Sequence, residues 1–138
     1  MVVDASVMVS RLVAGDVNHE ASRRWLDSHI ASGGLLIAPA LLLPELAGAI
    51  ARRTNRGLAR RAVAALLRLP ELRVVAIDAR LAEVAARLAG DLHLRGADAV
   101  YVATAAHLRL PLVTWDAEQR ERGAARIRVM APDTSRRT

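Results

Sequence analysis

Five acidic residues occupy positions in the sequence where a carboxylate can serve as a metal ligand or an acid–base group. Three of them, Asp4, Asp78 and Asp116, each come directly after a short apolar run that is typical of a buried strand. In an open parallel sheet the usable crevice lies outside the carboxyl ends of the strands, so these positions are candidates for chemistry. An Asp between a strand and a helix is also a favoured helix N-cap, so capping is the alternative interpretation of each of the three residues.

The other two acids, Glu45 and Asp98, stand in strongly apolar segments. Glu45 lies in APALLLPELAGAI and Asp98 in RGADAVYVATAAHL, in each case near the start of an expected helix. A charge without a partner is costly in such surroundings. An ion pair with Arg52 or Arg53 would satisfy Glu45, and the helix dipole would stabilise Asp98. Several carboxylates that converge on one cation would satisfy both acids equally well.

Strands and helices that would position these acids alternate along the chain. Apolar runs predict strands at 2–3, 35–38, 73–77, 112–114 and 127–130. Helical spacing predicts helices at about 6–14, 20–31, 41–53, 58–69, 80–92 and 97–108, and a short one after Asp116. Continuous apolar strands alternating with helices favour a parallel sheet covered on both faces. We therefore expect a three-layer α/β/α fold of the α/β class, with one domain at 1–131 and a polar, mobile C-terminal tail at 132–138.

Composition narrows the possible chemistry. The chain has no cysteine, which excludes a disulfide scaffold, a thiolate nucleophile and a Cys-ligated zinc site. All 20 basic residues are arginine and the formal net charge is +6, which favours contacts with a polyanion, although genomic base composition explains the arginine bias equally well. The N-terminus has no basic segment, and no uncharged apolar run approaches the ~18 to 20 residues needed to span a bilayer, so we expect a cytoplasmic protein.

Four segments together resemble a known family. VVDASV, LLLPELAGAI, DAVYVATAAHL and LVTWDAEQ are similar, in this order and over nearly the whole chain, to the PIN domain, and most closely to its VapC-type bacterial toxins. One local departure is Trp115, where the family usually has a smaller or polar residue. The resemblance implies a five-stranded parallel sheet with strand order 3-2-1-4-5. That order puts Asp78 at an edge strand, which favours its interpretation as an N-cap.

The resemblance also implies which residues carry the activity. The acidic cluster of the family falls on Asp4, Glu45, Asp98 and Asp116, and its small hydroxyl residues fall on Ser6 and Thr114. Ordinary capping or strand-end hydrogen bonds account for the two hydroxyls about as well as a role in orienting the carboxylates.

Crowded carboxylates raise one another's pKa and so favour a bound cation, and oxygen-only ligands suit Mg²⁺ or Mn²⁺. The expected reaction is metal-assisted hydrolysis of RNA phosphodiester bonds, with one or two ions. Arginines beside the acids would bind the RNA backbone, and Arg11, Arg52 and Arg95 are the candidates by sequence proximity.

Two further expectations and two alternatives accompany this interpretation. The VapC-like resemblance implies a VapB-type antitoxin as protein partner and a homodimer. One alternative is a PIN-like module that binds RNA or a protein without cleaving RNA. The other, a receiver domain or a haloacid-dehalogenase-like phosphatase, needs a lysine in its site, and this chain has none.

Overall fold

Five short parallel strands form the centre of the molecule. A computed structural model describes residues 1–132, and the predicted tail lies, beyond Pro132, outside the described residues. The strands are β1 (Val2–Val3), β2 (Leu36–Pro39), β3 (Leu72–Val75), β4 (Leu112–Val113) and β5 (Val129–Met130). Every pairing is parallel and the order is β3-β2-β1-β4-β5. This order confirms the prediction and makes β1 and β4 neighbours at the middle of the sheet.

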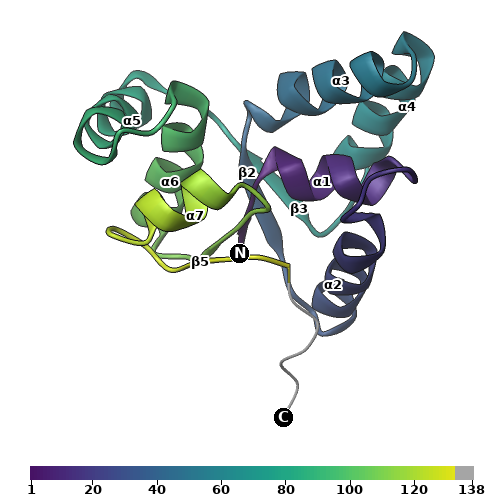
Figure 1. Cartoon of the computed structure of the whole chain (residues 1–138), viewed down its shortest axis with the longest axis horizontal. Coiled ribbons are helices and arrows are strands. Elements are labelled where there is room, and N and C mark those ends of the chain that lie inside the picture. The colour runs from purple at the N-terminus through teal and green to yellow at the C-terminus, as the bar shows by residue number, and fades with distance from the viewer. Residues whose placement is uncertain (133–138) are drawn as a thin grey trace.

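Within residues 1–132, seven helices cover the sheet in two groups (Figure 1). They are α1 (Ala5–Leu12), α2 (His19–Ala31), α3 (Leu42–Arg53), α4 (Arg56–Leu67), α5 (Ala79–Leu92), α6 (Gly96–Leu108) and α7 (Ala117–Gly123). Helices α1 to α4 lie on one side of the sheet and α5 to α7 on the other (Figure 1). The arrangement is the predicted three-layer α/β/α fold.

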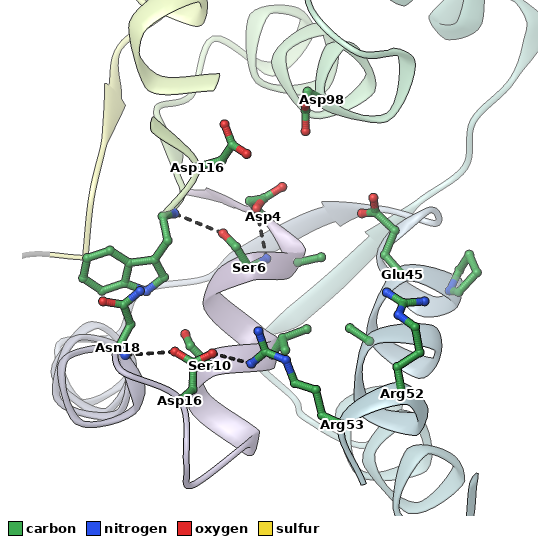
Figure 2. A pocket seen from close by; sticks show the side chains of 15 residues that line it. Asp4, Ser6, Ser10, Asp16, Asn18, Glu45, Arg52, Arg53, Asp98 and Asp116 are labelled. Carbon is green, nitrogen blue, oxygen red and sulfur yellow. Dashed lines mark hydrogen bonds and ion pairs between the residues drawn. The ribbon is translucent and has the colours of Figure 1, made fainter. Parts of the chain in front are cut away.

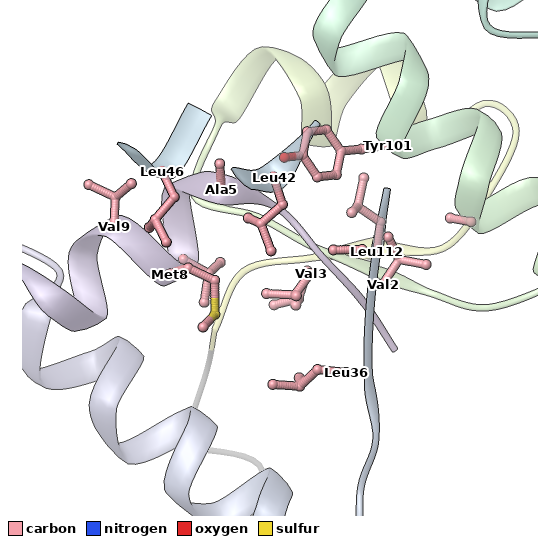
Figure 3. Close-up of a cluster of buried hydrophobic side chains, with 14 of the residues drawn as sticks. Val2, Val3, Ala5, Met8, Val9, Leu36, Leu42, Leu46, Tyr101 and Leu112 are labelled. Atoms are coloured by element: carbon pink, nitrogen blue, oxygen red, sulfur yellow. The ribbon is translucent and has the colours of Figure 1, made fainter. Parts of the chain in front are cut away.

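The core is densest around β1 and α6. Val2 and Val3 are fully buried, and Figure 3 shows Val3 beside Met8 of α1, whereas Val2 lies toward α6. Successive strand residues point to opposite faces, so these two valines serve both helical layers. Helix α6 is apolar on all sides and packs against α5, β1, β2 and β4. Such a helix belongs in the interior, and it carries Asp98 into the middle of the molecule.

The observed element boundaries differ from the predicted ones by at most two residues. Helix α4 begins at Arg56 because the Asn55 side chain caps it, accepting a hydrogen bond from the Leu58 N–H. The expectation of five buried strands is wrong at the edges. Arg73 and Val74 of β3 are exposed, because an edge strand has a neighbour on one side only. Among the described residues, no helix is long and apolar enough to cross a membrane.

Candidate active site

A groove of about 500 Å³ opens at the carboxyl ends of β1 and β4. The residues that line it include all four predicted acids, Asp4, Glu45, Asp98 and Asp116, together with Ser6. Figure 2 shows the four carboxyl groups around one common space, with each acid coming from a different part of the chain. The sheet order and α6 thus bring together residues that are up to 112 positions apart.

Asp4 and Asp116 leave the two central strands and cap the helices that follow. One oxygen of Asp4 accepts a hydrogen bond from the Ser6 N–H at 3.0 Å, at the start of α1. Asp116 accepts the Gln119 N–H at 2.7 Å, at the start of α7. The capping interpretation is therefore correct for both acids, and both still face the groove. Capping fixes the direction of each carboxylate and leaves its remaining oxygen for another partner.

A buried hydroxyl joins these two acids. Thr114, which is fully buried, donates a hydrogen bond to Asp4 Oδ2 at 3.1 Å and accepts one from the Asp116 N–H at 3.0 Å. The Ser6 hydroxyl lies 3.3 Å from that of Thr114 and accepts the Trp115 N–H at 3.0 Å. The two hydroxyl residues thus hold the exits of β1 and β4 in one hydrogen-bonded unit. These are the contacts that Ser6 and Thr114 would need for the predicted role of orienting the carboxylates.

Glu45 is held by a contact that the sequence did not indicate. It lies in the first turn of α3, and its Oε2 accepts a hydrogen bond from the phenol of Tyr101 on α6 at 2.6 Å. Burial raises the pKa of Glu45, the carboxylates of Asp4 and Asp98 raise it further, and the Tyr101 hydrogen bond opposes the rise. The alternative interpretation of Glu45, an ion pair with Arg52 or Arg53, does not occur within residues 1–132.

Asp98 and Asp116 share one arginine. Arg95 donates from Nε to Asp98 Oδ2 at 2.9 Å and from Nη2 to Asp116 Oδ2 at 3.0 Å. Burial still raises the pKa of Asp98, with Asp116 and Asp4 adding to the rise and Arg95 opposing it. Gln119, fully buried, contacts both acids: its backbone N–H donates to Asp116, and its side-chain amide donates to the backbone carbonyl of Asp98 at 3.3 Å. Sequence analysis missed Gln119 and Tyr101.

The donor set suits a hard divalent cation. All the acidic ligands offer oxygen, and Asp4, Glu45 and Asp98 each keep one carboxylate oxygen without a hydrogen-bond partner in the described part of the chain. Burial raises the pKa of both Glu45 and Asp98, neighbouring carboxylates add to the rise, and a bound cation would favour the ionised form of both acids. In this structure no three His or acidic side chains among residues 1–132 are arranged to hold a metal.

Asp78 and Arg11, which the sequence analysis considered, are not among the residues that line the groove. Asp78 caps α5, accepting the Leu81 N–H at 2.8 Å, and belongs to another hollow beside the edge strand β3. This placement confirms its interpretation as an N-cap. Arg11 faces Asp27 of α2 at 3.9 Å and is not among the groove-lining residues, so its selection by sequence proximity was wrong.

The groove continues away from the four acids to a second end, which acidic, basic and amide side chains line. Arg52, Arg53, Asp16 and Asn18 line it there, and Figure 2 shows Arg53 of α3 reaching across to Asp16 of the loop after α1. Burial opposes ionisation of Asp16, but hydrogen bonds from Arg53 and from the Asn18 N–H leave its pKa below the ordinary value. Of these residues the sequence had indicated only Arg52 for a role in the groove. The Asp16 and Arg53 contact joins residues 37 positions apart, which no local pattern reveals.

The PIN domain family model matches residues 1–125. The chain belongs to the PIN domain family. No curated protein sequence matches this PIN domain. It is similar in structure to the Mycobacterium tuberculosis toxin VapC20, described as cleaving the sarcin–ricin loop, with a TM-score of 0.73 and 23% identity over 87% of this chain and 92% of that one.

Two complexes show the same fold. VapBC2 from Rickettsia felis, bound to a DNA fragment from its promoter, matches with a TM-score of 0.71 and 12% identity, covering 94% of this chain and 96% of that one. A toxin–antitoxin complex from Klebsiella pneumoniae matches with a TM-score of 0.68 and 19% identity, covering 96% and 97%. At these identities the likeness concerns the fold, and this PIN domain has the fold found in VapC-type proteins.

Proposed function

We propose that this chain is a metal-dependent endoribonuclease of the VapC type, the toxin of a toxin–antitoxin pair. The observation that carries the proposal is the convergence of Asp4, Glu45, Asp98 and Asp116 on one groove from four parts of the fold. Membership of the PIN domain family supports it. Mg²⁺ or Mn²⁺ is the proposed cofactor because the ligands are all carboxylate oxygens.

Asp4, Asp98 and Asp116 are the proposed ligands, and Glu45 either completes the set or positions the attacking water. A bound cation would polarise the scissile phosphate and stabilise the charge that develops on the leaving oxygen. Thr114 and Ser6 keep the Asp4 carboxylate directed into the groove, and Tyr101 does the same for Glu45. Each orienting group is itself buried or hydrogen-bonded, so the carboxylates are placed before substrate arrives.

Arg52 is the proposed contact for the RNA backbone. It lines the groove on the same helix as Glu45 and has no ion-pair partner in residues 1–132. Its guanidinium folds back along α3, with Nη1 only 3.1 Å from the point where a Cβ on Gly48 would lie. The glycine therefore leaves room for this guanidinium in the groove, where it can bind a phosphate bidentately. Since RNA is the proposed substrate, the cytoplasm is the proposed place of action.

RNA cleavage is the direct test. Purified protein is incubated with total RNA and Mg²⁺ or Mn²⁺, and new 5′ ends are mapped. We expect discrete cleavage sites that require the metal and disappear in Asp98→Asn. Asp78→Asn, an aspartate that caps a helix outside the groove, is the matched control and should cut as the wild type does. Cleavage that persists in Asp98→Asn, or that survives chelation, would contradict the proposal.

The proposed partner is a VapB-type antitoxin. Solved structures of similar fold include a toxin–antitoxin complex and a VapBC complex on promoter DNA. We expect a short upstream reading frame with a DNA-binding N-terminal half, whose product binds this chain and stops RNA cleavage. We also propose a homodimer, which light scattering of the purified protein would measure. A gene without such a neighbour would favour a nuclease outside a toxin–antitoxin pair.

A PIN-like module that binds RNA or a protein without cleavage is the second candidate. The contact that favours it is the Arg95 bridge, which neutralises Asp98 and Asp116 without any metal. Calorimetric titration with Mn²⁺ separates the two candidates. A nuclease should bind Mn²⁺, and Asp98→Asn should weaken that binding strongly; equal binding in the two proteins would favour the non-cleaving module.

A further inference from the structure

Arg95 makes its strongest contacts with two acids of the proposed metal site. It is the residue before α6, with extended backbone. Its guanidinium spans from α6 to the loop after β4, with Nε 2.9 Å from Asp98 Oδ2 and Nη2 3.0 Å from Asp116 Oδ2. A single planar cation thus joins two carboxylates that come from separate elements.

The two sides of this contact differ in exposure. The Arg95 side chain is 68% exposed, whereas those of Asp98 and Asp116 are 14% and 28% exposed. Water competes for an exposed guanidinium, so such an ion pair is held weakly and a long flexible side chain can leave it without disturbing the fold. The two aspartates, by contrast, belong to a helix and to a capped turn that fix them. Arg95 is therefore the movable member of the cluster.

A divalent cation in the groove would need the same carboxylates that Arg95 holds. The guanidinium engages Oδ2 of Asp98 and Oδ2 of Asp116, which removes one oxygen of each acid from the donor set. A metal ion and a guanidinium that share these two carboxylates compete for their negative charge, so each lowers the apparent affinity of the site for the other.

We propose that Arg95 is a built-in counter-ion that neutralises Asp98 and Asp116 until a divalent cation displaces it. This inference rests on the proposed function, since it concerns the metal site of the nuclease. It follows that Arg95 raises the concentration of free metal at which the site becomes loaded. A purely structural role predicts the opposite: an arginine that merely holds the two aspartates in a ligating arrangement would strengthen metal binding.

The sign of the change in metal affinity tests the inference. Mn²⁺ is titrated calorimetrically into the full chain, as wild type, Arg95→Gln and Arg52→Gln. Arg52→Gln removes the same charge from an arginine that lines the groove and pairs with neither aspartate, so it measures the general electrostatic effect. We expect the Mn²⁺ dissociation constant of Arg95→Gln to be about three- to fivefold lower than that of Arg52→Gln. Equal constants, or a higher one in Arg95→Gln, would overturn the inference.

A spectroscopic readout follows the guanidinium itself. The Nε–H resonance of Arg95, assigned by its loss in Arg95→Gln, should shift toward that of a solvated arginine as Mg²⁺ is added. A resonance unchanged at saturating Mg²⁺ would show that metal and arginine do not compete. Thermal unfolding of each variant verifies that the exposed substitution leaves the fold intact.

Failure of this inference can be told from failure of the proposed function. If Mn²⁺ binds the wild type, binding is lost in Asp98→Asn, and Arg95→Gln equals Arg52→Gln, only the counter-ion role is wrong. If neither the wild type nor Arg95→Gln binds Mn²⁺, both proposals fall. Binding by Arg95→Gln alone would support the counter-ion role and contradict the proposed function, which requires the wild type to bind Mn²⁺.

Discussion

Asp4 and Asp78 have the same local structure and different surroundings. Each follows a strand, adopts an extended backbone and caps the next helix with one carboxylate oxygen. Asp4 leaves the central strand β1, beside β4, whereas Asp78 follows the edge strand β3. Only Asp4 therefore meets acids from other elements. The comparison teaches that position in the sheet, rather than the strand-then-Asp pattern, separates a candidate catalytic residue from a cap.

Replacing the two aspartates by asparagine tests the comparison most strongly. Asparagine also caps helices well, so both variants should fold. Asp4→Asn removes a charge from the acidic cluster, and we expect RNA cleavage to fall by at least about 100-fold, as for other groups that stabilise charge in a transition state. Asp78→Asn should retain wild-type rates. Initial rates on a labelled RNA with Mg²⁺ measure both, and equal losses would remove the distinction.

Two buried threonines allow the same comparison between the centre of the sheet and another place in the fold to be made for hydroxyl groups. Thr114 donates to Asp4 at the centre of the sheet, whereas Thr104 donates to the Val100 carbonyl of its own helix. Thr114→Val should lower cleavage about 10- to 100-fold, because the Asp4 carboxylate loses the donor that orients it. Thr104→Val is the matched control and should leave the rate unchanged. A loss of similar size in both variants would indicate general destabilisation, which urea unfolding would detect.

Tyr101 extends the comparison to an acid that does not follow a strand. Glu45 depends on α6 for its partner, so Tyr101→Phe should cost about 1–3 kcal/mol in the free energy of unfolding by leaving a half-buried carboxylate without its donor. Cleavage should fall by about tenfold. Urea unfolding and initial rates measure the two effects. Wild-type values for both would show that the Tyr101 hydroxyl does not support Glu45.

The smallest expected effect concerns Asp16, an acid of the same groove that is already paired. Its pKa lies below the ordinary value of 3.8, so its stabilising effect is present above pH 3.8 and is lost as the pH falls through the lowered pKa. Arg53 is 50% exposed, which limits the effect to about 1 kcal/mol or less. Urea unfolding of wild type and Asp16→Asn should differ at pH 7 and converge near pH 2. A difference that grows in acid would contradict this.

Much of the fold followed from sequence because its determinants are local. Apolar strands, helical spacing and helix caps predicted the α/β fold class, and the family resemblance predicted the strand order. The exposure of β3 was not predicted, because nothing in its sequence, LRVV, indicates that it pairs with a strand on one side only.

The four acids and two hydroxyls were also predicted, but their partners were not. Tyr101 meets Glu45 across 56 residues, and Arg95 meets Asp116 across 21. Such contacts depend on how α3, α6 and the loop after β4 pack, and no spacing along the chain encodes that. Arg95 illustrates the point: its proximity to the acids was predicted, and its contact with two of them was not.

The hydroxyl of Thr114 has a consequence for the order of events during synthesis. Asp4 leaves the ribosome well before Thr114 and Asp116, which follow it by more than a hundred residues. Val3 pairs with Val113, and the hydrogen bond from Thr114 to Asp4 forms only once that pairing exists. A growing chain therefore contains Asp4 and Glu45 well before Asp98 and Asp116 have been made. On the proposed function, the nascent protein cannot attack RNA beside the ribosome that makes it, and activity begins only when the last strands have joined the sheet.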